Sequence, residues 1–231
     1  MHIGLIGGIG VAATVVYYQR LAAAVAARGA GALALTIVHA DIHELIRNNL
    51  ADRRAEQAHA FLPLIERLKA AGCDCAALTS MGAHFCVDDL AALSPLPIVS
   101  AVAPLDAYFF ERGIQRIGLL GTRVVMRTRL YGKLVHTQAL ALDGEIELIG
   151  QTYQDVAVAG TCSPAQRALF LDAGRRLVAA GAEAIVLAGT DLNLAFDGQS
   201  PHYEVIDALD VHVALLADLA LNRTSLADLT A

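Results

Sequence analysis

The chain contains two copies of one short segment. Residues 70–80 read AAGCDCAALTS, and residues 179–189 read AAGAEAIVLAG. In each copy a glycine ends a helix, an acidic residue follows in the turn, and an apolar run leads to small or hydroxylated residues. Such short apolar runs are typical of parallel strands that are buried on both faces. When the copies are aligned, Ser80 stands opposite Gly189.

A second pair of segments supports an internal duplication, because 3–8 (IGLIGG) resembles 117–122 (IGLLGT). Predicted strands and helices alternate along the whole chain, which favours an α/β fold. We therefore predict two pseudo-symmetric lobes, each a mostly parallel sheet flanked by helices, with a cleft between them. Lobe 1 is placed at 1–100 and lobe 2 at 101–206. A closing C-terminal helix at 207–225 is expected to pack on lobe 1.

Composition excludes several classes of protein. Of the 231 residues 56% are hydrophobic, but no run approaches the roughly 18 apolar residues of a membrane span. The opening segment lacks the basic start of a signal peptide, so we expect a cytoplasmic protein without a membrane partner. A formal charge of −6, with no tryptophan, argues against nucleic acid. The cysteines lack the spacing of zinc or disulfide motifs, so we predict free thiols and no metal at Cys73, Cys75, Cys86 and Cys162.

Small and polar residues follow four of the predicted strands, at Gly8, Ser80, Thr122 and Asp191. Ligands of parallel α/β sheets bind beyond these carboxyl ends. The glycine turn around Gly8 opens a helix, and its free N–H groups suit a small carboxylate, although tight packing explains it as well. A dinucleotide is disfavoured because the Gly-x-Gly-x-x-Gly spacing is absent. Thr14 either donates to the same anion or is a satisfied helix hydroxyl.

Two further segments supply candidate groups in the first lobe. The polar stretch 47–54 lies between a strand end and a helix, as a mobile flap would. Within it Arg53 or Arg54 either binds a carboxylate bidentately or begins a solvated helix. Ser80 and His84 lie four residues apart at a strand-to-helix turn. His84 is either a catalytic base or a structural hydrogen-bonding residue.

The second lobe has its own expected elements. We predict a helix around 126–136, a strand near 146–148, and a helix that begins at Ser163-Pro164, with serine as N-cap and proline in the first turn. The apolar cluster 108–110 is either core or an interface.

Taken together, these positions resemble the aspartate/glutamate racemase superfamily over nearly the whole chain. Residues 4–10 with Thr14 resemble the family's first loop, and 118–122 its second-lobe opening. Asp52-Arg53 is similar to the family's Asp-Arg pair, and Asp207 with His212 to its last Asp…His segment. The resemblance implies a small-molecule amino or carboxylic acid as substrate, no cofactor, and a homodimer. It also implies that Arg53 grips a distal carboxylate.

The catalytic motifs of this family are altered. Its first-lobe Cys-Asn-Thr-x-His corresponds to 80–84 (SMGAH), and its second-lobe Gly-Cys-Thr-Glu corresponds to 188–191 (AGTD). A second-lobe lysine corresponds to Val158. Two-base racemisation suits thiolates, whereas a serine hydroxyl is a much weaker acid and glycine offers no side chain. The sequence therefore excludes the two-thiol mechanism.

Three hypotheses follow for the function. The first, which we favour, is another proton-transfer reaction, such as a one-base isomerisation, an elimination or a decarboxylation. Its proton carrier is Asp191 or His84, and its hydrogen-bond donor is Ser80 or Thr190. The second is racemisation with Asp191 and His84 as the base pair, and the third is binding without turnover. With Met81 and Val158 in the pocket wall, a larger or partly apolar acid is expected. The predicted substrate-binding residues are Gly8, Thr14, Arg53, Thr79, Met81, Thr122, Gly189 and His212.

Overall fold

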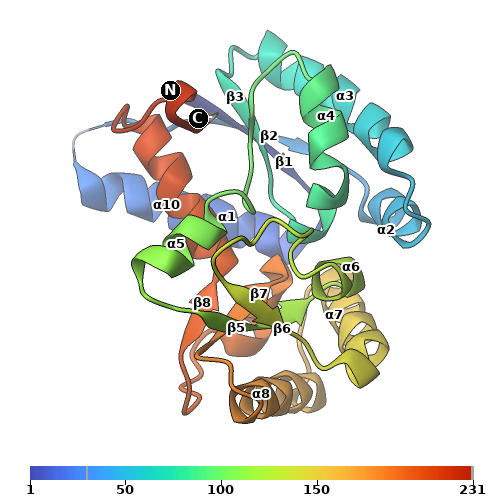
Figure 1. Cartoon of the computed structure of the whole chain (residues 1–231). Helices are drawn as coiled ribbons and strands as arrows, with labels where there is room; N and C mark the ends of the chain where they lie inside the picture. Colours follow the sequence, from blue (N-terminus) through green and yellow to red (C-terminus); the bar gives the residue numbers. More distant parts are fainter. Residues whose placement is uncertain (30, 230–231) are drawn as a thin grey trace. The chain divides into compact units, whose positions relative to one another are not determined.

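The computed structural model of the chain describes residues 1–29 and 31–229. Contacts within the chain separate two compact units (Figure 1). Unit 1 comprises Met1–Ala101 together with the chain from His212 onward, and unit 2 comprises Val102–Val211. Each unit is built on its own four-stranded sheet.

The sheet of unit 1 has the order β2-β1-β3-β4, and all of its neighbouring strands are parallel. The strands are β1 (His2–Gly7), β2 (Ala34–His39), β3 (Cys75–Leu78) and β4 (Ile98–Val99). The helices are α1 (Val11–Arg28), α2 (Ile42–Leu50), α3 (Arg54–Ala70), α4 (Val87–Leu93) and the main part of α10 (Ala208–Ala220), with the 3-10 turns η1 (Met81–Cys86) and η4 (Ala227–Leu229).

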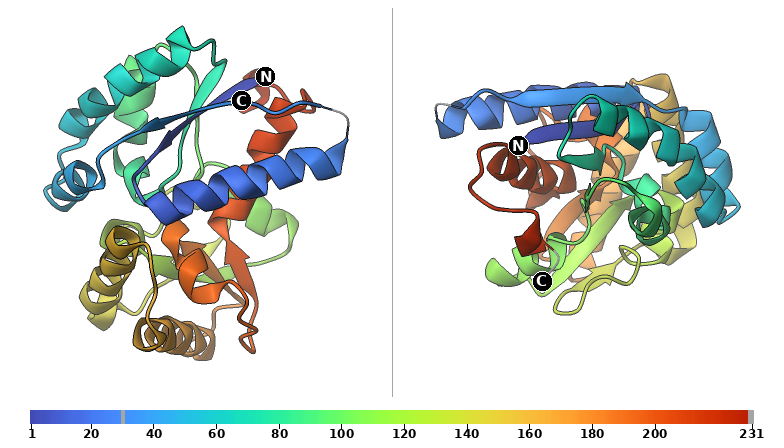
Figure 2. Two further views of the ribbon diagram at one scale, coloured as in Figure 1. Left: turned by 180° about the vertical axis from the view of Figure 1, so that it is seen from behind. Right: turned by 90° about the horizontal axis from the view of Figure 1, so that it is seen from above.

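Two glycines of β1 show how helices cover this sheet. A Cβ on Gly4 would lie 2.9 Å from the Leu68 side chain of α3, and a Cβ on Gly7 would overlap the Thr14 side chain of α1. Positions 4 and 7 point to opposite faces of a strand. Helices α3 and α1 therefore pack closely on opposite faces of the sheet, as the left view of Figure 2 shows.

The sheet of unit 2 has the order β6-β5-β7-β8 and is also parallel. The strands are β5 (Arg116–Gly121), β6 (Gln138–Leu140), β7 (Ala184–Ala188) and β8 (Val205–Asp207). The helices are α5 (Leu105–Glu111), α6 (Arg123–Arg127), α7 (Ile146–Ala159), α8 (Pro164–Ala179) and α9 (Asn193–Phe196), with the 3-10 turns η2 (Asp143–Glu145) and η3 (Thr190–Leu192). In both sheets the spatial order is second, first, third, fourth strand of the unit. The predicted α/β fold of two similar halves is confirmed.

The predicted helix over 126–136 is wrong beyond Arg127. Helix α6 ends at Arg127, and three residues that follow adopt left-handed backbone conformations: Arg129 (φ 52°), Leu130 (φ 59°) and Tyr131 (φ 61°). A run of left-handed residues is incompatible with a right-handed helix. The chain instead turns here toward β6.

The predicted strand near 146–148 is also wrong, because these residues form the first turn of α7. The buried residues Ile146, Ile149, Tyr153 and Val156 recur at intervals of three and four, which is the period of a helix. The edge strand of this sheet is β6 instead.

The polar stretch 47–54 is not a loop, since α2 runs to Leu50 and α3 begins at Arg54. The Asn48 side-chain amide donates to the Gln57 side-chain oxygen over 3.0 Å, and both residues are buried. Buried amides need such partners. These polar side chains therefore join two helices, and the flap prediction is corrected to a helix–turn–helix.

The high apolar content is mostly used in the two cores. The apolar cluster 108–110 is partly core and partly surface, because Phe109 is fully buried whereas Phe110 is 62% exposed.

No helix in 1–29 or 31–229 combines the length and hydropathy that crossing a bilayer requires.

The start of α8 at Ser163-Pro164 is confirmed, and the structure shows a complete capping box there. The Ser163 hydroxyl accepts from the Gln166 N–H over 3.3 Å, and the Gln166 side chain accepts from the Ser163 N–H over 2.9 Å. These bonds satisfy two donors that the helix start leaves open.

We predict that Ser163→Ala lowers the free energy of unfolding by about 1 kcal/mol, because the Gln166 N–H loses its acceptor. Urea denaturation measures the change. Ser200→Ala, at an exposed serine outside the helices, is the control and should change stability by less than about 0.5 kcal/mol. Equal effects of the two variants would contradict the capping assignment.

Candidate active site

Two threonines close the turn at the end of β1. The Thr14 hydroxyl accepts from the Gly8 N–H over 3.0 Å and donates to the Gly10 carbonyl over 2.8 Å. The Thr79 hydroxyl lies 3.3 Å from it and donates to the Ile6 carbonyl over 3.1 Å. These hydroxyls therefore tie the ends of β1 and β3 together. For Thr14 the structure supports a satisfied hydroxyl.

Ser80 follows β3 directly and precedes the turn η1. Its side chain is 5% exposed, and its hydroxyl makes no hydrogen bond with the residues that the structure describes. The next residue, Met81, is fully buried, while the Gly82 carbonyl accepts from the Asn49 amide over 2.9 Å. Ser80 thus carries an uncommitted hydroxyl at the carboxyl edge of the unit 1 sheet.

The turn between α2 and α3 presents the two candidate arginines. Arg54 is exposed and pairs with Asp52 over 2.8 Å, and this contact raises the pKa of its guanidinium. Arg53 is exposed and makes no ion pair within 1–29 and 31–229. Its N–H donates to the Asn48 carbonyl, and the neighbouring Asn49 binds η1, which places this turn beside the residues that follow β3. Of the two arginines, Arg53 is the one available to an anion.

His84 is held by backbone groups at both ring nitrogens. Nδ1 lies 2.9 Å from the Ser80 carbonyl, and Nε2 accepts from the Ala101 N–H over 2.9 Å. The carbonyl requires a proton on Nδ1, whereas the N–H requires a lone pair on Nε2. Burial lowers the pKa of His84 to about 4. The structure therefore supports the structural alternative, a neutral histidine that connects two loops.

His212 forms a buried pair with Tyr17 of α1. Its Nδ1 lies 2.9 Å from the Tyr17 hydroxyl, and the rings meet edge to face with centroids 5.7 Å apart. Burial and the proximity of His84 lower the pKa of His212 to about 3. This fully buried residue joins α10 to α1, and its role in substrate binding stays a prediction.

In unit 2 the residue that follows β5 caps the start of a helix. The Thr122 hydroxyl accepts from the Val125 N–H over 3.3 Å and starts α6. Gly121 pairs with Ala188 in the sheet, so Thr122 and Gly189 follow neighbouring strands. These two residues therefore lie at the carboxyl ends of adjacent strands.

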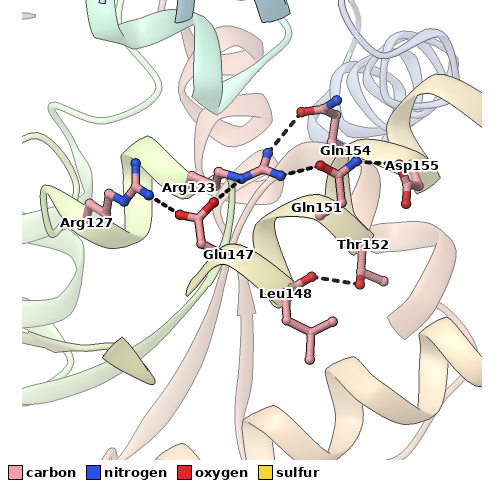
Figure 3. Close-up of polar contacts among 8 residues, drawn as sticks. All are labelled: Arg123, Arg127, Glu147, Leu148, Gln151, Thr152, Gln154 and Asp155. Carbon is pink, nitrogen blue, oxygen red and sulfur yellow. Dashed lines mark hydrogen bonds and ion pairs between the residues drawn. The ribbon is translucent and has the colours of Figure 1, made fainter. Parts of the chain in front are cut away.

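The next residue, Arg123, is committed to α7. Its guanidinium donates to Glu147 over 3.1 Å, to Gln154 over 3.0 Å and to Gln151 (Figure 3). A Cβ on Gly150 would overlap Arg123 Cγ, so only glycine at this position admits the arginine. Arg123 therefore fixes α6 against α7 rather than presenting a free positive charge.

Asp191 is a deeply buried carboxylate of unit 2, with 1% of its surface exposed. It accepts from the Tyr153 hydroxyl of α7 over 3.2 Å. Burial and the Asp191 charge raise the pKa of Tyr153 well above its ordinary value, although the Asp191 N–H and the Thr190 side chain interact with the phenol oxygen and oppose this shift. The phenol therefore stays protonated and acts as a donor. Tyr153 was not predicted as a site residue, because the sequence pattern indicated no helix at this position.

Gly189 lies under the same tyrosine ring. A Cβ on Gly189 would overlap Tyr153 Cε2, and it would be 2.8 Å from Tyr153 Cζ and 3.0 Å from Gly121 Cα. Real Cβ atoms do not approach carbon so closely, so position 189 has no room for a side chain while the ring stays in place. The Tyr153 ring therefore occupies the space that a side chain at position 189 would need.

None of the four cysteines has the environment of a reactive thiol. Burial raises the pKa of Cys75 to about 11 and that of Cys86 to about 12. Burial also raises the pKa of Cys73 and Cys162. Reactive thiolates require a lowered pKa. These thiols are protonated at neutral pH.

The expectation of an apolar pocket wall stays a prediction. Met81 is fully buried, and Val158 lies on α7 with 46% of its surface exposed. Neither position gives evidence of the polarity that a substrate would meet.

The comparisons with known proteins agree with this architecture. The model of the Asp/Glu/Hydantoin racemase family matches residues 6–216, so the chain belongs to this family. No match is found among curated protein sequences.

Solved structures share the fold over almost their whole length. A candidate Asp/Glu racemase from Yersinia pestis is 25% identical with a TM-score of 0.74, and the alignment covers 96% of this chain and 100% of that one. An aspartate racemase homologue from Pyrococcus horikoshii is 22% identical with a TM-score of 0.71, covering 95% and 99%. The aspartate racemase of Picrophilus torridus is 18% identical with a TM-score of 0.79, covering 95% and 94%.

The buried histidines generate a prediction on acid stability. Because the pKa of His84 is about 4 in the folded protein and about 6.5 in an unfolded chain, only the unfolded state takes up this proton between these values. The free energy of unfolding should therefore fall as pH falls from 6.5 to 4, by roughly 3 kcal/mol from His84 alone. His84→Gln should make the profile shallower when urea denaturation is followed against pH.

His59→Gln is the matched control, because His59 is exposed on α3. It should leave the pH profile unchanged. A His84→Gln profile as steep as that of the unmodified protein would show that His84 does not resist protonation.

Proposed function

We infer that this chain is an enzyme that acts on a small amino or carboxylic acid by proton transfer without thiols. The observation that carries the proposal is the state of its ionisable groups. One carboxylate, Asp191, is buried with a hydroxyl donor at the end of β7, whereas all four thiols are held protonated. Carboxylates are general bases when they are positioned and desolvated.

The proposed roles follow from which groups already have hydrogen-bond or ion-pair partners. Asp191 removes the Cα proton of the acid, and the electrons pass to the neighbouring carboxyl group of the substrate. In unit 1, considered by itself, Ser80 offers a hydroxyl that no described residue occupies, and Arg53 offers a guanidinium that suits a carboxylate. Bidentate binding of carboxylates is the characteristic use of arginine. Thr190 lies beside the phenol oxygen and completes the polar set of unit 2.

His84 is a poor second base, because both of its ring nitrogens bind backbone groups. Racemisation with Asp191 and His84 as the base pair is therefore the weaker hypothesis. A reaction with one proton carrier fits these groups better. In an isomerisation Asp191 returns the proton to another carbon, and in an elimination the electron pair expels a leaving group from the neighbouring carbon. In a decarboxylation CO₂ leaves first, and the protonated Asp191 gives its proton to the carbanion. The aspartate racemase of Picrophilus torridus, which shares the fold, supports an amino or dicarboxylic acid as substrate.

Binding without turnover is the second candidate. The observation that favours it is the depth of the key groups, since Asp191 and Ser80 are both almost fully buried. A binder needs no accessible base, so it would tolerate the loss of the Asp191 charge.

The test is proton NMR in D₂O with a panel of amino and small dicarboxylic acids, following the Cα–H signal and any new product. We expect turnover of at least one acid, and Asp191→Asn should lower the rate by about 10²-fold or more. Asp89→Asn, at an exposed aspartate on α4, is the control and should retain the rate. Binding of acids without exchange or product in the unmodified protein would favour the second candidate.

A further inference from the structure

The space beside Gly189 is closed from two sides. Tyr153 Cζ of α7 lies 2.8 Å from the position of a Cβ at 189, and the Gly121 backbone of β5 lies 3.0 Å from it. Unit 2 therefore uses an aromatic ring on a helix to fill the volume that a side chain on the strand end would take. The ring is 5% exposed, so it is part of the packed interior.

The same ring aims a donor at the carboxylate two residues further along. Tyr153 Oη lies 3.2 Å from Asp191 Oδ2. The Asp191 charge in turn favours the protonated phenol. A hydrogen bond to a carboxylate fixes its orientation and favours its charged form, whereas burial disfavours that form.

Helix α7 is itself held in rotation by Arg123. The guanidinium binds side chains at 147, 151 and 154 (Figure 3), which recur along one face of the helix at intervals of three and four. The buried residues Ile149, Tyr153 and Val156 lie on the adjacent face. Because Arg123 anchors α7 in this way, the position of the Tyr153 ring beside Gly189, the residue after β7, is fixed.

We propose that Tyr153 is the positioning residue of the Asp191 site: its hydroxyl orients the carboxylate, and its ring makes glycine obligatory at position 189. The proposal rests on the proposed function for its meaning in catalysis. Its two structural consequences, on the Asp191 carboxyl group and on position 189, are measurable without any substrate.

The first experiment compares Tyr153→Phe with the unmodified protein. Phenylalanine keeps the ring and removes only the hydroxyl. Carbon NMR of protein labelled at aspartate carboxyl carbons, with Asp191→Asn to assign the signal, follows the titration of Asp191. We expect Tyr153→Phe to move this titration upward by about one pH unit, because the charged form loses its donor. The acidic limb of the rate profile should move with it.

Tyr203→Phe is the matched control, because the Tyr203 hydroxyl also donates a hydrogen bond within unit 2, to the Leu171 carbonyl over 3.0 Å. It should leave the Asp191 titration in place. An unchanged titration in Tyr153→Phe, or an equal shift in both variants, would overturn the positioning role. If no acid is turned over while the titration moves as expected, the proposed function fails and the positioning role stands.

The second experiment tests the ring by a double-mutant cycle on thermal stability. Gly189→Ala should lower Tm by about 5 °C in the unmodified protein and by the same amount in Tyr153→Phe, because both keep the ring. In the Tyr153→Leu variant, Gly189→Ala should lower Tm by less than half as much. An equal cost of Gly189→Ala in the Tyr153→Leu variant and in the unmodified protein would contradict the assignment of this space to the ring.

Discussion

The buried carboxylate of Asp191 is the group to which its immediate surroundings in unit 2 must adapt. A carboxylate removed from water is costly unless hydrogen bonds compensate it. Tyr153 supplies a donor, and its ring reaches this position because residue 189 has no side chain. Gly150 in turn admits Arg123 against α7 and so fixes the helix that carries the tyrosine. Gly189, Gly150 and Arg123 thus hold Tyr153 in the position from which it donates a hydrogen bond to the buried carboxylate.

The two sheets share one strand order, but their carboxyl edges carry different chemistry. Unit 1 presents hydroxyl groups and two buried histidines that burial keeps neutral, of which His84 is bound at both nitrogens. Unit 2 presents the carboxylate of Asp191 and a phenol that stays protonated. In unit 1 the ring nitrogens of His84 are both bound to backbone groups, whereas in unit 2 the Asp191 carboxylate accepts a hydrogen bond from a phenol. The asymmetry is the physical reason for preferring chemistry with a single proton carrier.

Much of the fold followed from local patterns, and most of the errors concern tertiary partners. The duplicated apolar runs identified β3 and β7, and Ser163 identified the start of α8. The left-handed residues at 129–131 carry no glycine before position 132, so composition gave no signal for the turn. The interval-of-three-and-four pattern of α7 was hidden by its short apolar start, and Tyr153 was missed with it. Which hydroxyls and ring nitrogens are already occupied depends on contacts that sequence spacing does not contain.

The central claim is proton transfer without thiols, and a cysteine-free protein tests it most directly. The variant combines Cys73→Ala, Cys75→Ala, Cys86→Ala and Cys162→Ser, with circular dichroism to establish that it folds. Its rate of Cα–H exchange or product formation on the best acid of the panel should stay within about threefold of the unmodified protein, since no thiol takes part. A folded cysteine-free protein whose rate falls by about 10²-fold or more would contradict the account and return the chemistry to a thiol.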